Sequence, residues 1–193
     1  GGFNYEIIQG FAVLEGDILL GKVNEHGIIP RKIRGRGLGL NSAFGRWPDG
    51  IVPYLAPIGN SAVQRANIAK AIEHWTERTS ITFVELADVD KDRYPNYLAF
   101  IPSSGCASYV GMKGEKQDIM VSDTCSMGSI VHEIGHALGL FHEHTRPDRD
   151  NFVQVDTAQI IDGKEPNFNI LNAGVVNYGP YDYGSIMHYG EYF

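Results

Sequence analysis

The apolar residues of this chain fall into short runs once the sequence passes residue 50, and the pattern of these runs predicts four strands. Short runs that are rich in β-branched and aromatic side chains and bounded by turn residues are typical of strands that bury at least one face. We predict strands at residues 51–55, 80–85, 97–101 and 118–122. Together they supply the sheet of the predicted fold.

Two helices are predicted beside these strands. Asn60 or Ser61 can cap the first helix, whose apolar side chains recur at i, i+4 and i+7 and form a stripe that faces a core. The stripe consists of Ile68, Ile72 and Trp75, in a helix that ends near Thr79. The second helix is expected to begin between Met127 and Ser129. This order of elements predicts an α+β domain with a mixed sheet and the second helix beneath it.

The segment before about residue 46 differs from the rest. Glycine and proline punctuate it, and it holds two short apolar runs, residues 11–14 and 17–20, followed by a basic, glycine-spaced stretch at residues 31–37. We interpret the segment as turn-rich and the basic stretch as an exposed loop. A second polar region, rich in Asn, Gly, Pro and Tyr, extends from about residue 153 to residue 183.

The composition favours one globular domain, or one domain with an appendage. The 193 residues are 43% hydrophobic, which is enough for a core, and the net charge of −7 argues against nucleic acid as the main partner. No apolar stretch reaches the length of about 18 residues that a membrane span needs. The first residues lack the charged and apolar regions of a signal peptide, so we expect any such peptide to be already absent.

Residues 132–142 read H-E-I-G-H-A-L-G-L-F-H and predict a catalytic metal site. Histidines four apart lie on one face of a helix, so His132 and His136 can bind one ion. Gly139 can adopt the bend that ends the helix and brings His142 round as a third ligand. Three histidines leave a position open on zinc, as a catalytic site requires. An ordinary amphipathic helix can carry H-E-x-x-H by accident, but Gly139 and His142 make that alternative much weaker.

Further segments carry a resemblance to one protein family. Residues 142–150 read H-E-H-T-R-P-D-R-D, residues 185–189 read S-I-M-H-Y, residues 47–54 read W-P-D-G-I-V-P-Y and residues 105–111 read G-C-A-S-Y-V-G. With the histidine motif they resemble the astacins, zinc metalloproteases of the metzincin clan, from about residue 47 to residue 189. The resemblance implies a zincin-like catalytic domain with a mixed twisted sheet, a backing helix and an active-site helix.

The resemblance also implies roles for individual residues. Zn²⁺ would be the cofactor, and Glu133 would be the general base that takes a proton from water and returns it to the leaving amine. Tyr189 would bind zinc at rest and later stabilise the oxyanion, and Met187 would form an apolar floor under the metal. A substrate would add as a strand to the edge formed by Ser108, Tyr109 and Val110. Ala107 stands there in place of the family's usual tryptophan.

Cys106 and Cys125 could be two free thiols or one disulfide. Their position matches a disulfide of the astacin fold, so the resemblance implies a bond that closes the intervening loop and contributes about 3 kcal/mol. Disulfides persist in oxidising compartments, and we therefore expect a secreted, extracellular protein. We expect it to be a monomer that acts on protein or peptide substrates.

Residues 14–18 read L-E-G-D-I and resemble the F-x-G-D motif of astacin pro-segments, with Leu14 in place of phenylalanine. The resemblance implies that Asp17 binds the zinc in a latent form, and the alternative is an ordinary Gly-Asp turn. We expect residues 1–37 to be a pro-segment-like extension and residues 38–193 to be the catalytic domain. An activating protease would cut between about Arg34 and Leu38. The chain ends soon after Tyr189, so the C-terminal part of the family's domain is expected to be missing.

Two other functions compete with this one. Another metzincin subclass would keep the three histidines, but it would not account for S-I-M-H-Y or for residues 142–150. A catalytically silent, zinc-stabilised extracellular binding module would need the metal ligands but not Glu133, because a zinc scaffold does not use that carboxylate. We therefore predict a secreted zinc-dependent endopeptidase.

Overall fold

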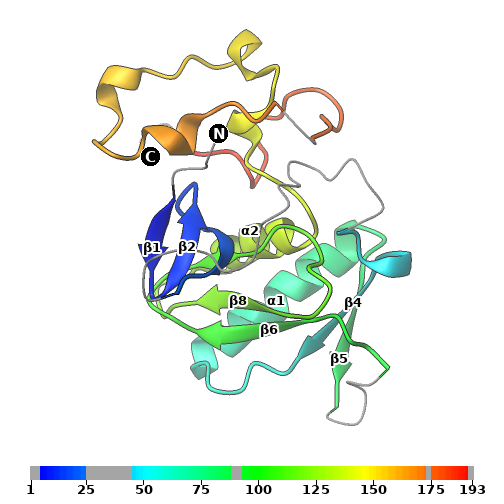
Figure 1. Cartoon of the computed structure of the whole chain (residues 1–193). Coiled ribbons are helices and arrows are strands. Elements are labelled where there is room, and N and C mark those ends of the chain that lie inside the picture. Colours follow the sequence, from blue (N-terminus) through cyan, green and yellow to red (C-terminus); the bar gives the residue numbers. More distant parts are fainter. Residues whose placement is uncertain (1–4, 25–44, 88–92, 173–174, 191–193) are drawn as a thin grey trace.

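A computed structural model describes residues 5–24, 45–87, 93–172 and 175–190 of the chain (Figure 1). Within these residues one sheet has the strand order β1-β2-β3-β7-β8-β6-β4-β5. The strands are β1 (Glu6–Ile8), β2 (Phe11–Leu14), β3 (Ile18–Lys22), β4 (Ile51–Leu55), β5 (Thr82–Leu86), β6 (Tyr97–Pro102), β7 (Ala107–Ser108) and β8 (Lys116–Val121). The helices are α1 (Ala62–Arg78) and α2 (Met127–Ala137), with short 3-10 helices at Pro48–Gly50, Glu143–Thr145, Arg149–Asn151, Thr157–Gln159 and Glu165–Phe168.

The four strands predicted from the sequence are confirmed as β4, β5, β6 and β8, with ends that shift by one or two residues. They run parallel to one another, and the short strand β7 pairs antiparallel with β8. The chain reaches each new parallel strand through a crossover, the first of which contains α1. The result is the predicted mixed sheet of an α+β domain.

Both helices pack against the sheet through one hydrophobic core. Ile68 of α1 and Ile134 of α2 are fully buried in the same cluster as Val52 and Ile119 of the sheet. Of the two candidate caps for α1, Ser61 is the one used, since its hydroxyl accepts a hydrogen bond from the backbone of the helix's first turn. The indole of Trp75 donates to the carbonyl of Val131 and so ties α1 to α2 directly.

The N-terminal segment is more regular than the turn-rich chain we expected. Strands β1, β2 and β3 form an antiparallel meander, and β3 joins the edge of the main sheet by pairing parallel with β7, with Ile18 opposite Ser108 (Figure 1). All four residues of β2 are buried, so its sequence lacks the alternation of apolar and polar residues that indicates a half-exposed strand. The basic stretch at residues 31–37 lies outside the described residues.

The residues after α2 form a lobe with little regular structure, coloured yellow to red in Figure 1. Arginine side chains hold it together: the Arg149 guanidinium donates to the carbonyl of His144 at 3.0 Å and to the carbonyl of Phe168 at 2.6 Å. This lobe contacts the N-terminal meander, where Lys164 pairs with Glu6. None of the helices that the structure describes is long and apolar enough to cross a membrane.

Candidate active site

Helix α2 carries the first two predicted ligands. The hydroxyl of Ser126 caps the helix by accepting a hydrogen bond from the Ser129 amide at 3.0 Å. One turn separates His132 from His136, and their rings meet edge to face with centroids 4.6 Å apart. The helical spacing therefore brings the two imidazoles to one side of α2, as the sequence indicated.

A bend after α2 brings in the third histidine. Gly139 has φ = +105°, a conformation that side-chain-bearing residues rarely adopt, and its amide donates to the carbonyl of His136 at 2.8 Å. The chain then turns back, and the Nε2 atom of His142 lies 3.2 Å from the Nε2 atom of His132. Three imidazole nitrogens consequently face one point.

The carboxylate of Asp17 occupies the fourth side of this group. Its Oδ2 atom lies 3.3 Å from the Nε2 atoms of both His132 and His142, and its Oδ1 atom lies 3.5 Å from the Nε2 atom of His136. One ligand atom from each of the four side chains lies within 4.8 Å of the others, which is compatible with a single metal ion. The turn between β2 and β3 delivers Asp17 from more than a hundred residues away in the sequence.

The donor set fits zinc. Nitrogen and carboxylate oxygen are ordinary zinc ligands, and four of them allow tetrahedral coordination. The Nε2 atom of His136 and one oxygen of Asp17 are buried without a hydrogen-bond partner, which is costly unless a cation satisfies them. Burial lowers the pKa of His136 to about 4, so this imidazole is neutral and has a lone pair to offer.

The other nitrogen of each ring, Nδ1, makes a hydrogen bond. The Nδ1 atom of His132 lies 2.7 Å from the carbonyl of Ile186, and that of His136 lies 2.8 Å from the carbonyl of Leu140. The Nδ1 atom of His142 lies 2.8 Å from a carboxylate oxygen of Glu15. Such outer contacts select the tautomer that points Nε2 at the metal. Glu15 stands at the variable position of the L-E-G-D-I motif, so nothing in the sequence predicted this contact.

Glu133 lies on α2 beside the first ligand and is 2% exposed. One of its carboxylate oxygens is buried without a hydrogen-bond partner. Burial, and secondarily the charge of Asp17, raises the pKa of Glu133 well above its ordinary value. A buried carboxylate with a raised pKa and one oxygen free of hydrogen bonds is suited to proton transfer.

Comparison with known proteins places this chain in a family. The family model for astacin, peptidase family M12A, matches residues 40–193. The chain belongs to the astacin family. Zinc is the metal of this family, and the described histidine cluster agrees with that assignment.

Curated astacin-family relatives are similar over most of the chain. Human tolloid-like protein 1 is 37% identical over 94% of this chain, and the zinc metalloproteinase nas-4 of Caenorhabditis elegans is 36% identical over 92% of it. A bone morphogenetic protein 1 homologue of Strongylocentrotus purpuratus is 41% identical over 76% of the chain. The chain spans 18%, 56% and 24% of these three proteins, respectively.

A solved structure supports the same fold. High choriolytic enzyme 1, a hatching enzyme zinc-protease from the medaka fish Oryzias latipes, is 34% identical with a TM-score of 0.66, and the match covers 75% of this chain and 72% of that one. The structure of myroilysin, at 23% identity and a TM-score of 0.53, agrees in fold. The predicted metzincin architecture is confirmed.

The astacin Met-turn packs under α2. Met187 is buried, and its sulfur lies 2.8 Å from the position that a Cβ atom on Gly135 would take. The carbonyl of Met187 accepts a hydrogen bond from the amide of Glu143 at 2.8 Å, directly after the third histidine. Met187 therefore joins the helix to the segment that carries His142.

Tyr189 lies beside the histidines with its hydroxyl directed to the N-terminal segment. The ring packs on His144 with centroids 4.0 Å apart and on His142 with centroids 4.6 Å apart. Its hydroxyl donates to the backbone carbonyl of Glu15. The structure thus brings Tyr189 to the site and shows its hydroxyl hydrogen-bonded to the turn that contains Asp17.

The edge strand of the astacin sheet is shorter than expected and already paired. Strand β7 ends at Ser108, so Tyr109 and Val110 follow it outside regular structure. The amide of Ser108 donates to the carbonyl of Asp17 at 2.9 Å. Ala107 packs in a cluster with Phe11 of β2. The chain's own N-terminal segment therefore occupies the edge where we expected a peptide substrate.

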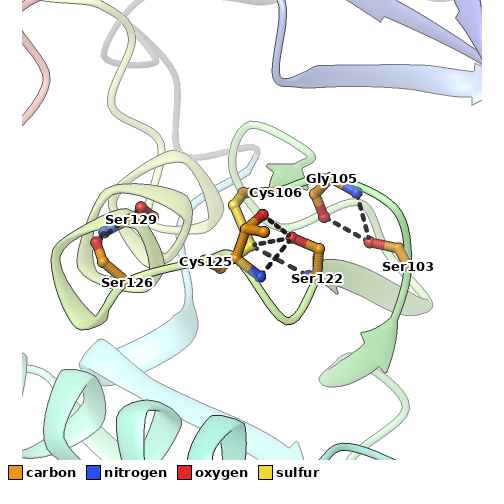
Figure 2. Close-up of a disulfide and its surroundings, with 8 residues drawn as sticks. Ser103, Gly105, Cys106, Ser122, Cys125, Ser126 and Ser129 are labelled. Atoms are coloured by element: carbon orange, nitrogen blue, oxygen red, sulfur yellow. Dashed lines mark hydrogen bonds between the residues drawn. A yellow bond between two sulfur atoms is a disulfide. The ribbon is translucent and has the colours of Figure 1, made fainter.

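One disulfide connects this edge to the active-site helix. Cys106, next to β7, is bonded to Cys125, next to the cap of α2 (Figure 2). The neighbouring Ser122 amide donates to the sulfur of Cys125. The predicted bond is thus present in the structure, and it joins the two elements that border the metal site.

Proposed function

We propose that this chain is the catalytic domain of a secreted zinc-dependent endopeptidase, held latent by its N-terminal segment. The observation that carries the proposal is the convergence of three histidine Nε2 atoms next to the buried, partly unpaired carboxylate of Glu133. Family membership supports the same activity, and the disulfide supports an oxidising compartment. The substrates would be proteins or peptides, and the domain would act as a monomer.

The ligands of the active form would be His132, His136 and His142, with Tyr189 as an additional one. When bound, zinc supplies a Lewis acid that polarises the scissile carbonyl and acidifies water. Glu133 takes a proton from the attacking water and returns it to the nitrogen of the leaving amine. Burial, the larger cause of its raised pKa, remains after Asp17 has left, and a carboxyl group whose pKa is raised can act first as a base and then as an acid.

Peptide binding would use the edge strand. An extended peptide can pair with β7 only after β3 has left it, because an edge strand offers one row of free backbone groups. The hydroxyl of Tyr189 would then be released from Glu15 and become available to the oxyanion. Met187 would keep the floor of the site fixed throughout.

Latency would rest on the N-terminal segment. Asp17 fills the position that a water molecule needs, and its backbone carbonyl is bonded to Ser108 of the edge strand. Burial alone would raise the pKa of Asp17, but the charge of His142 and the hydrogen bonds of the three histidines outweigh it and hold that pKa well below its ordinary value, so this carboxylate is an anion suited to a metal. We place the segment at residues 1–37 and the catalytic domain at residues 38–193, with a boundary outside the described residues.

The match to human tolloid-like protein 1 supports a shared N-terminal segment, because it covers 94% of this chain, which is more than residues 40–193 contain. An activating protease would cut within the basic stretch between about Arg34 and Leu38. Trypsin is the laboratory equivalent, since it cleaves after arginine and lysine.

The test of the catalytic proposal is Glu133→Gln. After trypsin treatment the wild-type chain should cleave a peptide library, and a chelator should abolish the cleavage. The variant should keep one zinc per chain but lose at least about 100-fold in kcat, because the base is gone while the ligands remain. Glu77→Gln, at an exposed position of α1, is the matched control and should behave as wild type. Proteolysis by Glu133→Gln at the wild-type rate would refute the mechanism. A trypsin-treated wild-type chain that binds zinc but cleaves no peptide would leave the binding-module alternative.

The test of latency is Asp17→Ala. The intact wild-type chain should be nearly inactive and should gain activity on trypsin treatment. The intact variant should already be partly active, because the fourth position is open and β3 is held on β7 less firmly once the carboxylate no longer binds the metal. After trypsin treatment both chains should have the same rate, which controls for damage to the site. An intact wild-type chain that is as active as the treated one would exclude latency.

A further inference from the structure

The three ligand histidines differ in which part of the chain accepts the hydrogen bond from Nδ1, the ring nitrogen that faces away from the metal position. His132 and His136 donate from Nδ1 to the backbone carbonyls of Ile186 and Leu140, which both lie in the part of the chain after α2. His142 instead donates to a carboxylate on the N-terminal segment, that of Glu15, which lies 127 positions away in sequence. One of the three outer partners is therefore lost if that segment leaves.

The contact between Glu15 and His142 is buried on both sides. Glu15 is 1% exposed and the side chain of His142 is 0% exposed, so no water competes for the bond. A carboxylate is buried this deeply only where a partner compensates its desolvation. Among the described residues, His142 is the hydrogen-bond partner of the Glu15 side chain.

The backbone conformation of the turn holds the Glu15 side chain in this position. Glu15 has φ = +55° and Gly16 has φ = +86°, and a non-glycine residue holds such a value only when surrounding contacts enforce it. The Glu15 carbonyl supplies one such contact by accepting the hydroxyl of Tyr189. Pairing of Leu14 with Ile18 closes the turn from the other side.

The two carboxylates of the turn hold one imidazole from opposite sides. Asp17 faces the Nε2 atom of His142 at 3.3 Å, on the side of the metal, while Glu15 faces its Nδ1 atom at 2.8 Å. Asp17 therefore acts as a ligand and Glu15 does not. The two contributions can be separated by mutating one residue at a time.

We propose that Glu15 is a positioning residue for the zinc, through which the N-terminal segment tightens metal binding as well as blocking the site. The Glu15 carboxylate accepts the Nδ1–H of His142, fixes the tautomer with the Nε2 lone pair toward the ion, and makes that imidazole a stronger ligand. This inference rests on the zinc site of the proposed function. It implies that the intact chain holds zinc more tightly than the chain from which the segment has been removed.

The primary experiment measures zinc affinity of the intact chain by competition with a chelator of known affinity. Glu15→Ala should weaken zinc binding about 10- to 100-fold, the usual effect of losing an outer partner of a ligand histidine. Glu15→Gln should retain most of the affinity, because the amide oxygen can still accept the Nδ1–H bond. Glu6→Ala is the control on the same meander, where Glu6 pairs with Lys164 outside the cluster, and it should stay within about 2-fold of wild type.

A second readout separates positioning from loss of the whole turn. In the zinc-loaded wild type, the proton on Nδ1 of His142 should give a resolved, strongly hydrogen-bonded NMR signal. This signal should vanish in Glu15→Ala and shift in Glu15→Gln, while the signals of His132 and His136 persist. Glu15→Ala should also remain inactive without trypsin, since Asp17 still occupies the site.

The outcomes are distinct. Wild-type zinc affinity in Glu15→Ala would overturn the inference while leaving the proposed function intact. Weaker zinc binding accompanied by the trypsin-independent activity expected of Asp17→Ala would also overturn it, because the whole turn would then have come away. A wild-type chain that binds no zinc would overturn this inference and the proposed function together.

Discussion

At the scale of the residue, the absence of a side chain at Gly135 decides how closely the Met-turn approaches α2. Gly135 lies between Glu133 and His136 on the active-site helix, and a Cβ atom there would stand 2.8 Å from the sulfur of Met187 and 3.4 Å from the ring of Trp75. Contacts of 2.8 Å are shorter than packed side chains tolerate. Gly135 therefore serves packing, whereas Gly139 serves the bend.

Gly135→Ala should destabilise the zinc-loaded chain by about 1–3 kcal/mol, because the sulfur of the buried Met187 must shift to make room for the new Cβ atom. The matched control is Gly128→Ala on the same helix, where the nearest atom that the new Cβ would meet is the Ser126 hydroxyl at an ordinary 3.6 Å. The control should be neutral or stabilising by up to about 1 kcal/mol, since alanine favours a helix. Urea unfolding measures both, and equal effects would contradict the packing argument.

At the scale of the element, α2 depends on what lies directly before it. Ser126 caps the helix, and Cys125, its neighbour, is tied by the disulfide to the beginning of β7 (Figure 2). The start of the helix and the edge strand are thus fixed to each other covalently. This arrangement sets the distance between the ligands on α2 and any strand paired with β7.

Ser126→Ala should lower the free energy of unfolding by about 1 kcal/mol, because the first turn of α2 loses the acceptor for the Ser129 amide. Ser126→Asp should retain wild-type stability, since aspartate caps equally well and favours the positive end of the helix dipole. Chemical denaturation of the three chains checks this expectation. A Ser126→Asp variant as unstable as Ser126→Ala would show that the cap is not the cause.

At the scale of the whole molecule, the metal site joins three parts of the chain that are far apart in sequence. Asp17 comes from the meander, His132 and His136 come from α2, and His142 comes from the segment after the bend. Closing such separate parts around one ion makes metal binding part of folding stability.

Removing zinc from the intact chain with a chelator should therefore lower its thermal midpoint. A ligand that binds only the folded state stabilises it by about 4 kcal/mol when its free concentration is 1,000 times Kd. His136→Ala should unfold at a low midpoint that no longer responds to the chelator, which is the control for effects of the chelator itself. Calorimetry with and without zinc checks both, and a wild-type midpoint that ignores zinc would contradict the assignment.

Much of the fold was readable from local patterns. The strands β4, β5, β6 and β8, both helices and a cap at Asn60 or Ser61 follow from periodicity and capping, within a few residues. The meander was missed because β2 is buried on both faces and so lacks alternation. Strand β7 is only two residues long and exists because β8 and β3 lie on either side of it.

Local spacing was enough to predict one part of the site: two histidines one helical turn apart, a glycine where the helix must bend, and a third histidine just beyond it. Tertiary structure alone decided that Glu15 bonds His142, that the Tyr189 hydroxyl meets the Glu15 carbonyl, and that β3 covers β7. The two kinds of contact differ in how far apart their residues lie in the sequence. Backbone geometry makes near neighbours meet at fixed intervals, whereas contacts across more than a hundred residues depend on how the whole sheet and its edge assemble.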